Sequence, residues 1–163
     1  MADHSRIIEL GRQLGSVALR VLENDHVRFK AVHEDEAPSS LESLLNRWLC
    51  EVDGDRTIAV SNAHSDRTVF GAPEVNHAFR AWHDWAHIRH RLPFTPEGEH
   101  AAYLLQLDDM RRVCGAITNA RALRNLLWAE VVGQVQYELT HGEFPDDQVA
   151  FVVRLVRAIE EAA

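Results

Sequence analysis

Residues 73–93 read PEVNHAFRAWHDWAHIRHRLP, and this stretch predicts an amphipathic helix. Pro73 suits the first turn of a helix, whereas Pro93 cannot continue one, so the two prolines place the helix between about residues 73 and 92. At about 100° per residue, one side of this helix is almost entirely apolar. That side carries Val75, Ala78, Phe79, Trp82, Trp85, Ala86 and Ile88. We expect it to pack against the protein core.

The opposite side of the same helix concentrates histidines around a carboxylate. Five of the ten histidines in the chain fall between residues 77 and 100. His83 and His87 are four residues apart, so on a helix their imidazoles point the same way, and such a pair readily binds one metal ion. Asp84 lies directly beside them. Two interpretations stay open: a metal site, or the solvated face of an amphipathic helix.

Outward from this helix, the sequence predicts a mainly α-helical fold, a single-domain bundle of about six helices over residues 1–163. Five further segments have helical spacing or residues typical of helix boundaries. They begin at Ser5, Ser39, Thr95, Thr118 and Pro145, and they end at about Phe29, Leu49, Cys114, His141 and Ile159. Two short runs of β-type residues, 57–60 and 68–70, flank a polar segment. We therefore also expect a small β-hairpin near residues 56–70.

The composition is typical of a folded globular protein, since 46% of the 163 residues are hydrophobic and 26% are charged. The formal net charge of −8 argues against an extended nucleic-acid surface, because binding to a polyanion requires a basic patch. No apolar run approaches the ~20 residues of a membrane span. The N-terminus does not have the form of a signal peptide. We therefore expect a cytoplasmic protein without a membrane-spanning segment.

A carboxylate in the predicted helix between Thr118 and His141 is the first candidate for a third ligand. This helix is apolar on nearly every side, so we expect it to be central and buried. Glu130 within it would then be an interior carboxylate, which is costly unless it is paired or bound to a metal ion. One interpretation is a buried ion pair with an arginine such as Arg80. The other is that Glu130 completes the site begun by the histidines.

Two further residues are candidates for a fourth ligand or for a hydrogen-bond partner of a ligand. Glu99 lies in the segment FTPEGEH, residues 94–100, at a predicted helix start. Acidic residues are expected at such a position in any case, because they interact favourably with the helix dipole. His64 lies in the polar segment of residues 62–66 and would supply a third imidazole.

The string His83-Asp84-Trp85-Ala86-His87 resembles the HExxH helix of zinc metallopeptidases, with Asp84 in place of the glutamate. The resemblance implies that both histidines bind zinc and that the acid between them is the general base. It also implies that a downstream glutamate is the third ligand. The aspartate is about one methylene shorter than the family's glutamate, which changes its reach toward a metal-bound water.

The pair His83-Asp84, with His64 upstream and Asp108 or Asp109 downstream, resembles the HD-domain phosphohydrolases. Those proteins are all-helical and cut phosphoesters with one or two divalent metal ions. This resemblance implies that the aspartate itself is a metal ligand. A carboxylate di-iron site is a third hypothesis, and the segment from Glu97 to His100 would provide one of its Glu-x-x-His pairs.

Longer strings are similar to those of a group of uncharacterised bacterial and phage helical proteins. The strings are FRAWHDWAH (79–87), FTPEGE (94–99), WAEVVGQ (128–134) and FPDDQ (144–148). The resemblance covers roughly residues 60–150 and implies no particular activity.

Taken together, the sequence predicts a metal-dependent hydrolase. The metal would be a divalent ion, zinc by preference, with manganese or iron also compatible with histidine and carboxylate ligands. Asp84 would orient or deprotonate the water that the ion activates, or it would accept a hydrogen bond from a ligand histidine. Arg80, Arg89 and Arg91 around the cluster favour a small phosphorylated substrate, a phosphoester or a nucleotide.

The alternative hypothesis belongs to a different class of protein. It is a non-enzymatic helical module of phage or plasmid type that binds another protein and presents a solvent-exposed histidine face. The oligomeric state does not follow from the sequence under either hypothesis.

Overall fold

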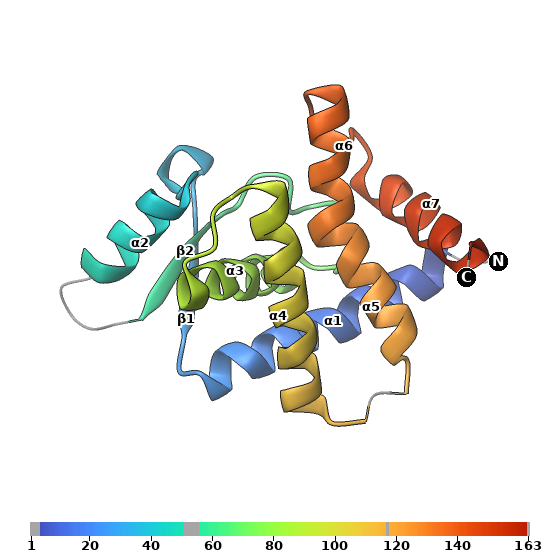
Figure 1. Ribbon diagram of the computed structural model, residues 1–163, viewed down its shortest axis with the longest axis horizontal. Helices are drawn as coiled ribbons and strands as arrows, with labels where there is room; N and C mark the ends of the chain where they lie inside the picture. The colour runs from blue at the N-terminus through green and yellow to red at the C-terminus, as the bar shows by residue number, and fades with distance from the viewer. Residues whose placement is uncertain (1–3, 51–55, 117, 163) are drawn as a thin grey trace.

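The computed structural model describes residues 4–50, 56–116 and 118–162 (Figure 1). These residues form α1 (His4–Asn24), β1 (Arg28–Val32), the short 3-10 helix η1 (Glu34–Glu36), α2 (Leu41–Cys50), β2 (Thr57–Ser61), α3 (Pro73–His90), α4 (Pro96–Cys114), α5 (Ala120–Trp128), the π-helical segment η2 (Ala129–Gly133), α6 (Gln134–His141) and α7 (Gln148–Glu161). The fold is mainly α-helical, as predicted. Within the described residues all six predicted helices are present, the fifth of them divided into α5, η2 and α6. None of these helices is both long enough and apolar enough to span a membrane.

Helix α3 lies at the centre of the molecule, with the two strands and α2 towards one end and α5 to α7 towards the other (Figure 1). It packs against α1, α2, α4 and both strands. Pro73 occupies its first turn, and Arg91 in the left-handed conformation ends it. The apolar side predicted from the sequence is confirmed, because Trp82 and Ala86 are fully buried within the core. The central position of α3 follows from this broad apolar side.

The predicted β-hairpin near residues 56–70 is wrong. Its first strand exists as β2, but β2 pairs in parallel with β1, with Arg28 opposite Thr57 and Val32 opposite Ser61. Parallel strands need a crossover connection, and the chain between β1 and β2 contains α2. The sequence also placed Phe29 at the end of the first helix, whereas α1 ends at Asn24 and Phe29 belongs to β1.

Residues 68–70, which were expected as the second strand of the hairpin, pack against α1 instead. Val69 and Phe70 are buried, and the Phe70 ring stacks on Phe79 of α3 with the ring centroids 4.4 Å apart. A Cβ atom at Gly11 of α1 would lie 2.0 Å from the Val69 carbonyl oxygen. Only glycine at position 11 permits this close approach of the segment to α1. The burial of Val69 and Phe70 therefore holds residues 68–70 against α1 and not in a second strand.

The long helix predicted from Thr118 to His141 is confirmed, because α5, η2 and α6 follow one another without a break. The residues at the junctions of α5, η2 and α6 keep right-handed helical dihedral angles, and Gly142, with φ of 77°, ends the helix as predicted. The π-helical segment η2 was not predicted. Such segments often occur at functional sites, and this one contains Glu130.

Candidate metal centre

The turn between α3 and α4 brings the start of α4 back over the last turns of α3. Thr95 caps α4, since its hydroxyl oxygen accepts a hydrogen bond from the backbone N–H of Gly98 at 3.2 Å. A Cβ atom at Gly98 would lie 1.9 Å from the carbonyl oxygen of Pro93, so a glycine is needed where the helix start meets the turn. The next residue, Glu99, is thereby placed over the histidines of α3.

Three potential ligand atoms converge at this point. Oε2 of Glu99 lies 2.9 Å from Nε2 of His83 and 3.5 Å from Nε2 of His87, and the two Nε2 atoms are 3.1 Å apart. His87 is fully buried, whereas the side chains of His83 and Glu99 are 22% and 11% exposed. The group could hold a metal ion. These exposed fractions show that solvent reaches the group from the side of His83 and Glu99.

The other nitrogen of each imidazole is hydrogen-bonded away from the centre. Nδ1 of His87 lies 2.9 Å from the backbone oxygen of Leu92, and Nδ1 of His83 lies 3.2 Å from Oε1 of Gln106. When each Nδ1 carries the hydrogen and donates it to these oxygens, each Nε2 presents a lone pair. Two lone pairs and a carboxylate oxygen then face one another. This arrangement is repulsive unless a cation, either a proton or a metal ion, lies between them.

Gln106 is a residue of the site that the sequence did not reveal. It is fully buried on α4, and among the described residues its Nε2 has no hydrogen-bond partner. Its role is to orient the imidazole of His83, and only the position of Gln106 seven residues after Glu99 could have indicated it. That spacing is two helical turns, so both side chains lie on the same face of α4.

The electrostatics of the centre agree with a shared positive charge. Burial alone would raise the pKa of Glu99, but hydrogen bonds to His83 and His87 lower the pKa to about 2. Burial lowers the pKa of His83, and the hydrogen bond and charge of Glu99 more than reverse this, so the net shift of its pKa is upward. The upward shift of this pKa favours a proton on His83, which can supply the cation between the three atoms when no metal ion is bound.

Asp84 lies next to this group without belonging to it. Burial raises the pKa of Asp84 to about 6, with the positive charges of His83 and His87 lowering it and the negative charge of Glu99 raising it. The carboxylate thus interacts electrostatically with all three residues. Its oxygens are not among the converging ligand atoms.

Glu130, the expected third ligand, is not a member of the group either, and Glu99 takes that place. Oε2 of Glu130 accepts a hydrogen bond from Nε2 of Gln134 at 2.8 Å. Burial raises the pKa of Glu130 to about 8, while Gln134 and the charge of Arg80 lower it. Arg80 lies one turn before His83 on α3, and its charge is the link between Glu130 and this helix. The alternative prediction, a buried ion pair with Arg80, is not found among the described residues either: Glu130 is half-buried, and Nη1 of Arg80 donates a hydrogen bond to the backbone oxygen of Ser61.

His64, the other expected imidazole, is exposed in the loop after β2 and is not a member of the group. In this loop, the neighbouring residue Ser65 makes the contacts with α3. The hydroxyl oxygen of Ser65 accepts a hydrogen bond from Nδ2 of Asn76 at 3.0 Å and lies 3.1 Å from Nε2 of His77.

The downstream aspartates implied by the HD-domain resemblance also lie outside the centre. Asp109 is buried, where it accepts hydrogen bonds from Trp82, Arg89 and Arg112. Asp108 is exposed and pairs with Arg111 of the same helix. Glu97 and His100, which suggested a di-iron pair, are exposed at the start of α4.

Comparison of the chain with models of protein families, with curated proteins and with solved structures gave no match. The family resemblances inferred from the HDxxH string therefore stay predictions.

Proposed function

We propose that this protein is a metal-dependent hydrolase in which His83, His87 and Glu99 hold one divalent ion. The observation that carries the proposal is the convergence of two Nε2 atoms and one carboxylate oxygen within 3.5 Å of one another, with both Nδ1 atoms hydrogen-bonded to fixed oxygens. Two imidazoles and one carboxylate form a ligand set typical of catalytic zinc, so zinc is the proposed ion. Manganese or iron would accept the same set with additional oxygen ligands.

Three protein ligands leave a coordination position for water or substrate. The partial exposure of His83 and Glu99 supports this, since it leaves one side of the centre reachable from solvent. A bound divalent ion lowers the pKa of its water toward ~7 and so provides a nucleophile at neutral pH. Asp84 is the proposed proton acceptor, because it is a half-buried carboxylate that interacts electrostatically with all three ligands.

The proposed substrate is a small phosphoester or nucleotide. Of the three arginines that suggested this class, Arg89 is committed to Asp109 through two hydrogen bonds. Arg80 is the arginine whose charge acts on Asp84, and its Nη1 donates a hydrogen bond to the backbone oxygen of Ser61 at 2.7 Å. We assign Arg80 the role of stabilising negative charge on the phosphoryl group.

The alternative hypothesis of a binding module with a solvent-exposed histidine face is less favoured. His87 is fully buried, and an interface residue on an exposed face would be accessible. Only the outer histidine of the helix, His90, is exposed.

Metal analysis of protein purified without an affinity tag tests the proposed centre. We expect about one equivalent of a divalent transition metal in the wild type and a large loss of it in His83→Ala, His87→Ala and Glu99→Gln. His90→Ala is the matched control, because this histidine lies on the same helix outside the group, and it should keep the metal. Full metal content in all three ligand variants would exclude the centre.

The hydrolase assignment is tested separately on the metal-loaded protein. Phosphomonoesters, phosphodiesters and nucleotides should include a substrate whose turnover disappears with Glu99→Gln and not with His90→Ala. A protein that binds one equivalent of metal and cleaves none of these classes would leave the centre standing and refute the proposed substrate class.

A further inference from the structure

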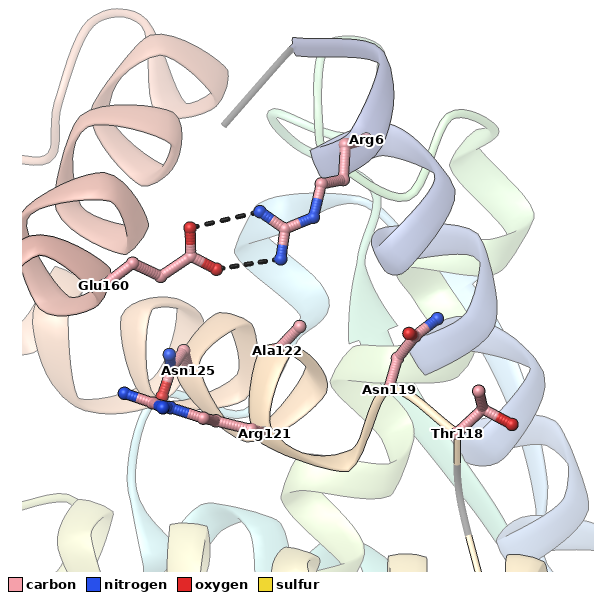
Figure 2. Close-up of a pocket in the computed structure, with 7 residues that line it drawn as sticks. All are labelled: Arg6, Thr118, Asn119, Arg121, Ala122, Asn125 and Glu160. Atoms are coloured by element: carbon pink, nitrogen blue, oxygen red, sulfur yellow. Dashed lines mark hydrogen bonds and ion pairs between the residues drawn. The ribbon is translucent and has the colours of Figure 1, made fainter. Parts of the chain in front are cut away.

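A polar cleft of about 360 Å³ lies between the start of α1, the first turns of α5 and the end of α7 (Figure 2). It shares no residue with the histidine centre. Its volume is within the range of sites for small molecules. Four of its features point to one kind of ligand.

The first feature is the side-chain amide of Asn125, which is open to the cleft. Asn125 of α5 lines the cleft and is only 7% exposed. Among the described residues, its side-chain amide makes no hydrogen bond. The fully buried side-chain atoms without a partner among the described residues belong to other residues, so this amide has access to the cleft. A ligand in the cleft can therefore take its hydrogen bonds in place of solvent.

The second feature is the uncapped start of the long helix. Asn119 is the N-cap residue of α5, but its side chain makes no capping hydrogen bond. Its Nδ2 donates instead to Oε1 of Gln13 on α1 at 3.4 Å. The backbone N–H groups of the first turn thus have no side-chain acceptor, and Thr118 and Asn119 place this helix end at the cleft. Helix N-termini of this kind bind anions.

The third feature is the charge of the lining. Two arginines and one glutamate line the cleft. The guanidinium of Arg6 donates two hydrogen bonds to the carboxylate of Glu160, at 2.9 and 3.1 Å, so these two charges neutralise each other (Figure 2). Arg121 forms no ion pair with any described residue. One positive charge is therefore left in excess.

The fourth feature is the direction of the hydrogen bonds. The guanidinium of Arg121, the NH₂ group of Asn125 and the first-turn N–H groups of α5 are all donors. They belong to separate groups around the cleft, and a tetrahedral oxyanion with several acceptor oxygens satisfies more of them than a planar carboxylate does.

We propose that this cleft binds the phosphate group of a small phosphorylated molecule, with Arg121, Asn125 and the N-terminus of α5 as its donors. The phosphate could belong to an organic metabolite or be inorganic phosphate. The cleft has room beyond the phosphate itself, which favours the organic ligand. Because the site is separate from the histidine centre, the proposal does not depend on the proposed hydrolase activity.

Titration calorimetry of the full chain with glycerol 3-phosphate, inorganic phosphate and acetate tests the site. Both phosphates should bind saturably and acetate should not. The phosphate that binds more tightly shows whether the site prefers an organic or the inorganic ligand. Arg121→Met should weaken phosphate binding by about tenfold or more, because it removes a charge-assisted hydrogen bond. Asn125→Leu, which keeps the branched shape of the side chain without its hydrogen-bonding groups, should also weaken it.

Arg124→Met is the matched control, since Arg124 is an exposed arginine on the same helix that does not line the cleft. It should bind phosphate as the wild type does. The proposal is overturned by the absence of saturable phosphate binding, by equal weakening in the two arginine variants, or by acetate binding as tightly as phosphate. Arg121 is exposed, so its variant remains informative even if Asn125→Leu does not fold.

Discussion

His83 and His87 face each other across one turn of α3 with their Nε2 atoms 3.1 Å apart, while each Nδ1 is hydrogen-bonded to an oxygen on a different segment. The oxygen for His87 comes from the turn after α3, and the oxygen for His83 comes from Gln106 on α4. Each imidazole ring is thus fixed in orientation by a hydrogen bond of its Nδ1, on the side away from the Nε2 atoms. Such an arrangement presents two lone pairs to a cation without the need for a large side-chain movement.

The first prediction concerns Gln106, which orients the imidazole of His83. Gln106→Leu should weaken metal binding by roughly 10- to 100-fold, because the loss of a hydrogen-bond partner behind a histidine ligand usually has that effect. Competition with a chromogenic chelator measures the affinity. The melting temperature of the metal-free variant should fall little, since Nε2 of Gln106 makes no hydrogen bond among the described residues. Gln136→Leu on exposed α6 is the control. Unchanged affinity in Gln106→Leu would show that His83 is held without this contact.

The second prediction separates the role of Asp84 from that of a ligand. Asp84→Asn should keep most of the metal, because the carboxylate is not among the converging ligand atoms. Turnover of a substrate should fall by about 10²-fold or more, the usual scale for the loss of a general base. Metal content and rate are measured on the same preparation. Loss of the metal would instead support the ligand role that the HD-domain resemblance implies.

The third prediction is a pH dependence of stability that arises from Glu130. Burial raises the pKa of Glu130 to about 8 from the ordinary value of 4.5, against the smaller opposing effects of Gln134 and Arg80. The unfolded chain releases this proton above about pH 4.5, whereas the folded chain keeps it until about pH 8. The contribution of Glu130 to stability is therefore present at low pH and is lost as the pH rises through this range.

Glu130→Gln removes the titration and keeps the shape of the side chain. The variant should gain stability relative to the wild type between about pH 5 and pH 8, by at most about 1.4 kcal/mol per pH unit. Urea unfolding at several pH values measures this difference. Glu143→Gln, at an exposed position after α6, is the control. A constant difference between Glu130→Gln and the wild type at every pH would contradict the raised pKa of Glu130.

The fourth prediction concerns the glycine that lets α4 approach the preceding turn. Gly98→Ala places a Cβ atom 1.9 Å from the carbonyl oxygen of Pro93, so the start of α4 must move. We expect a loss of stability of about 1–3 kcal/mol, the usual cost of overpacking. Metal binding should weaken as well, because Glu99 moves with the helix start. Glu97→Ala, one residue away and exposed, should change neither quantity. Wild-type metal affinity in Gly98→Ala would show that the glycine serves stability alone.

The histidine pair and most helix boundaries could be predicted because they depend on residues close together in the sequence. Pro73 and Gly142 mark helix ends through their own backbone preferences, and both lie where the pattern placed them. The i, i+4 spacing of His83 and His87 fixes the relative direction of their side chains on any helix. The apolar side of α3 followed from the same local geometry.

The β-hairpin and the third ligand could not be predicted in this way. The pairing of β1 with β2 joins residues about thirty positions apart, and short β-type runs do not indicate their partners. Glu99 and Glu130 were both acidic residues on other predicted helices. Which of them meets the histidines depends on how α4 and the long helix pack against α3, and no local pattern contains that information.

By itself, the sequence determined that the protein is mainly helical and that one helix carries two histidines on one side beside Asp84. The tertiary structure alone decided that Glu99 faces these histidines, that Gln106 orients one of them and that Glu130 lies near Arg80. The physical reason is the range of the interactions. Helix formation and side-chain direction arise within one or two turns, whereas a three-residue centre requires two helices to be packed in a particular register by the turn at Pro93 and Gly98.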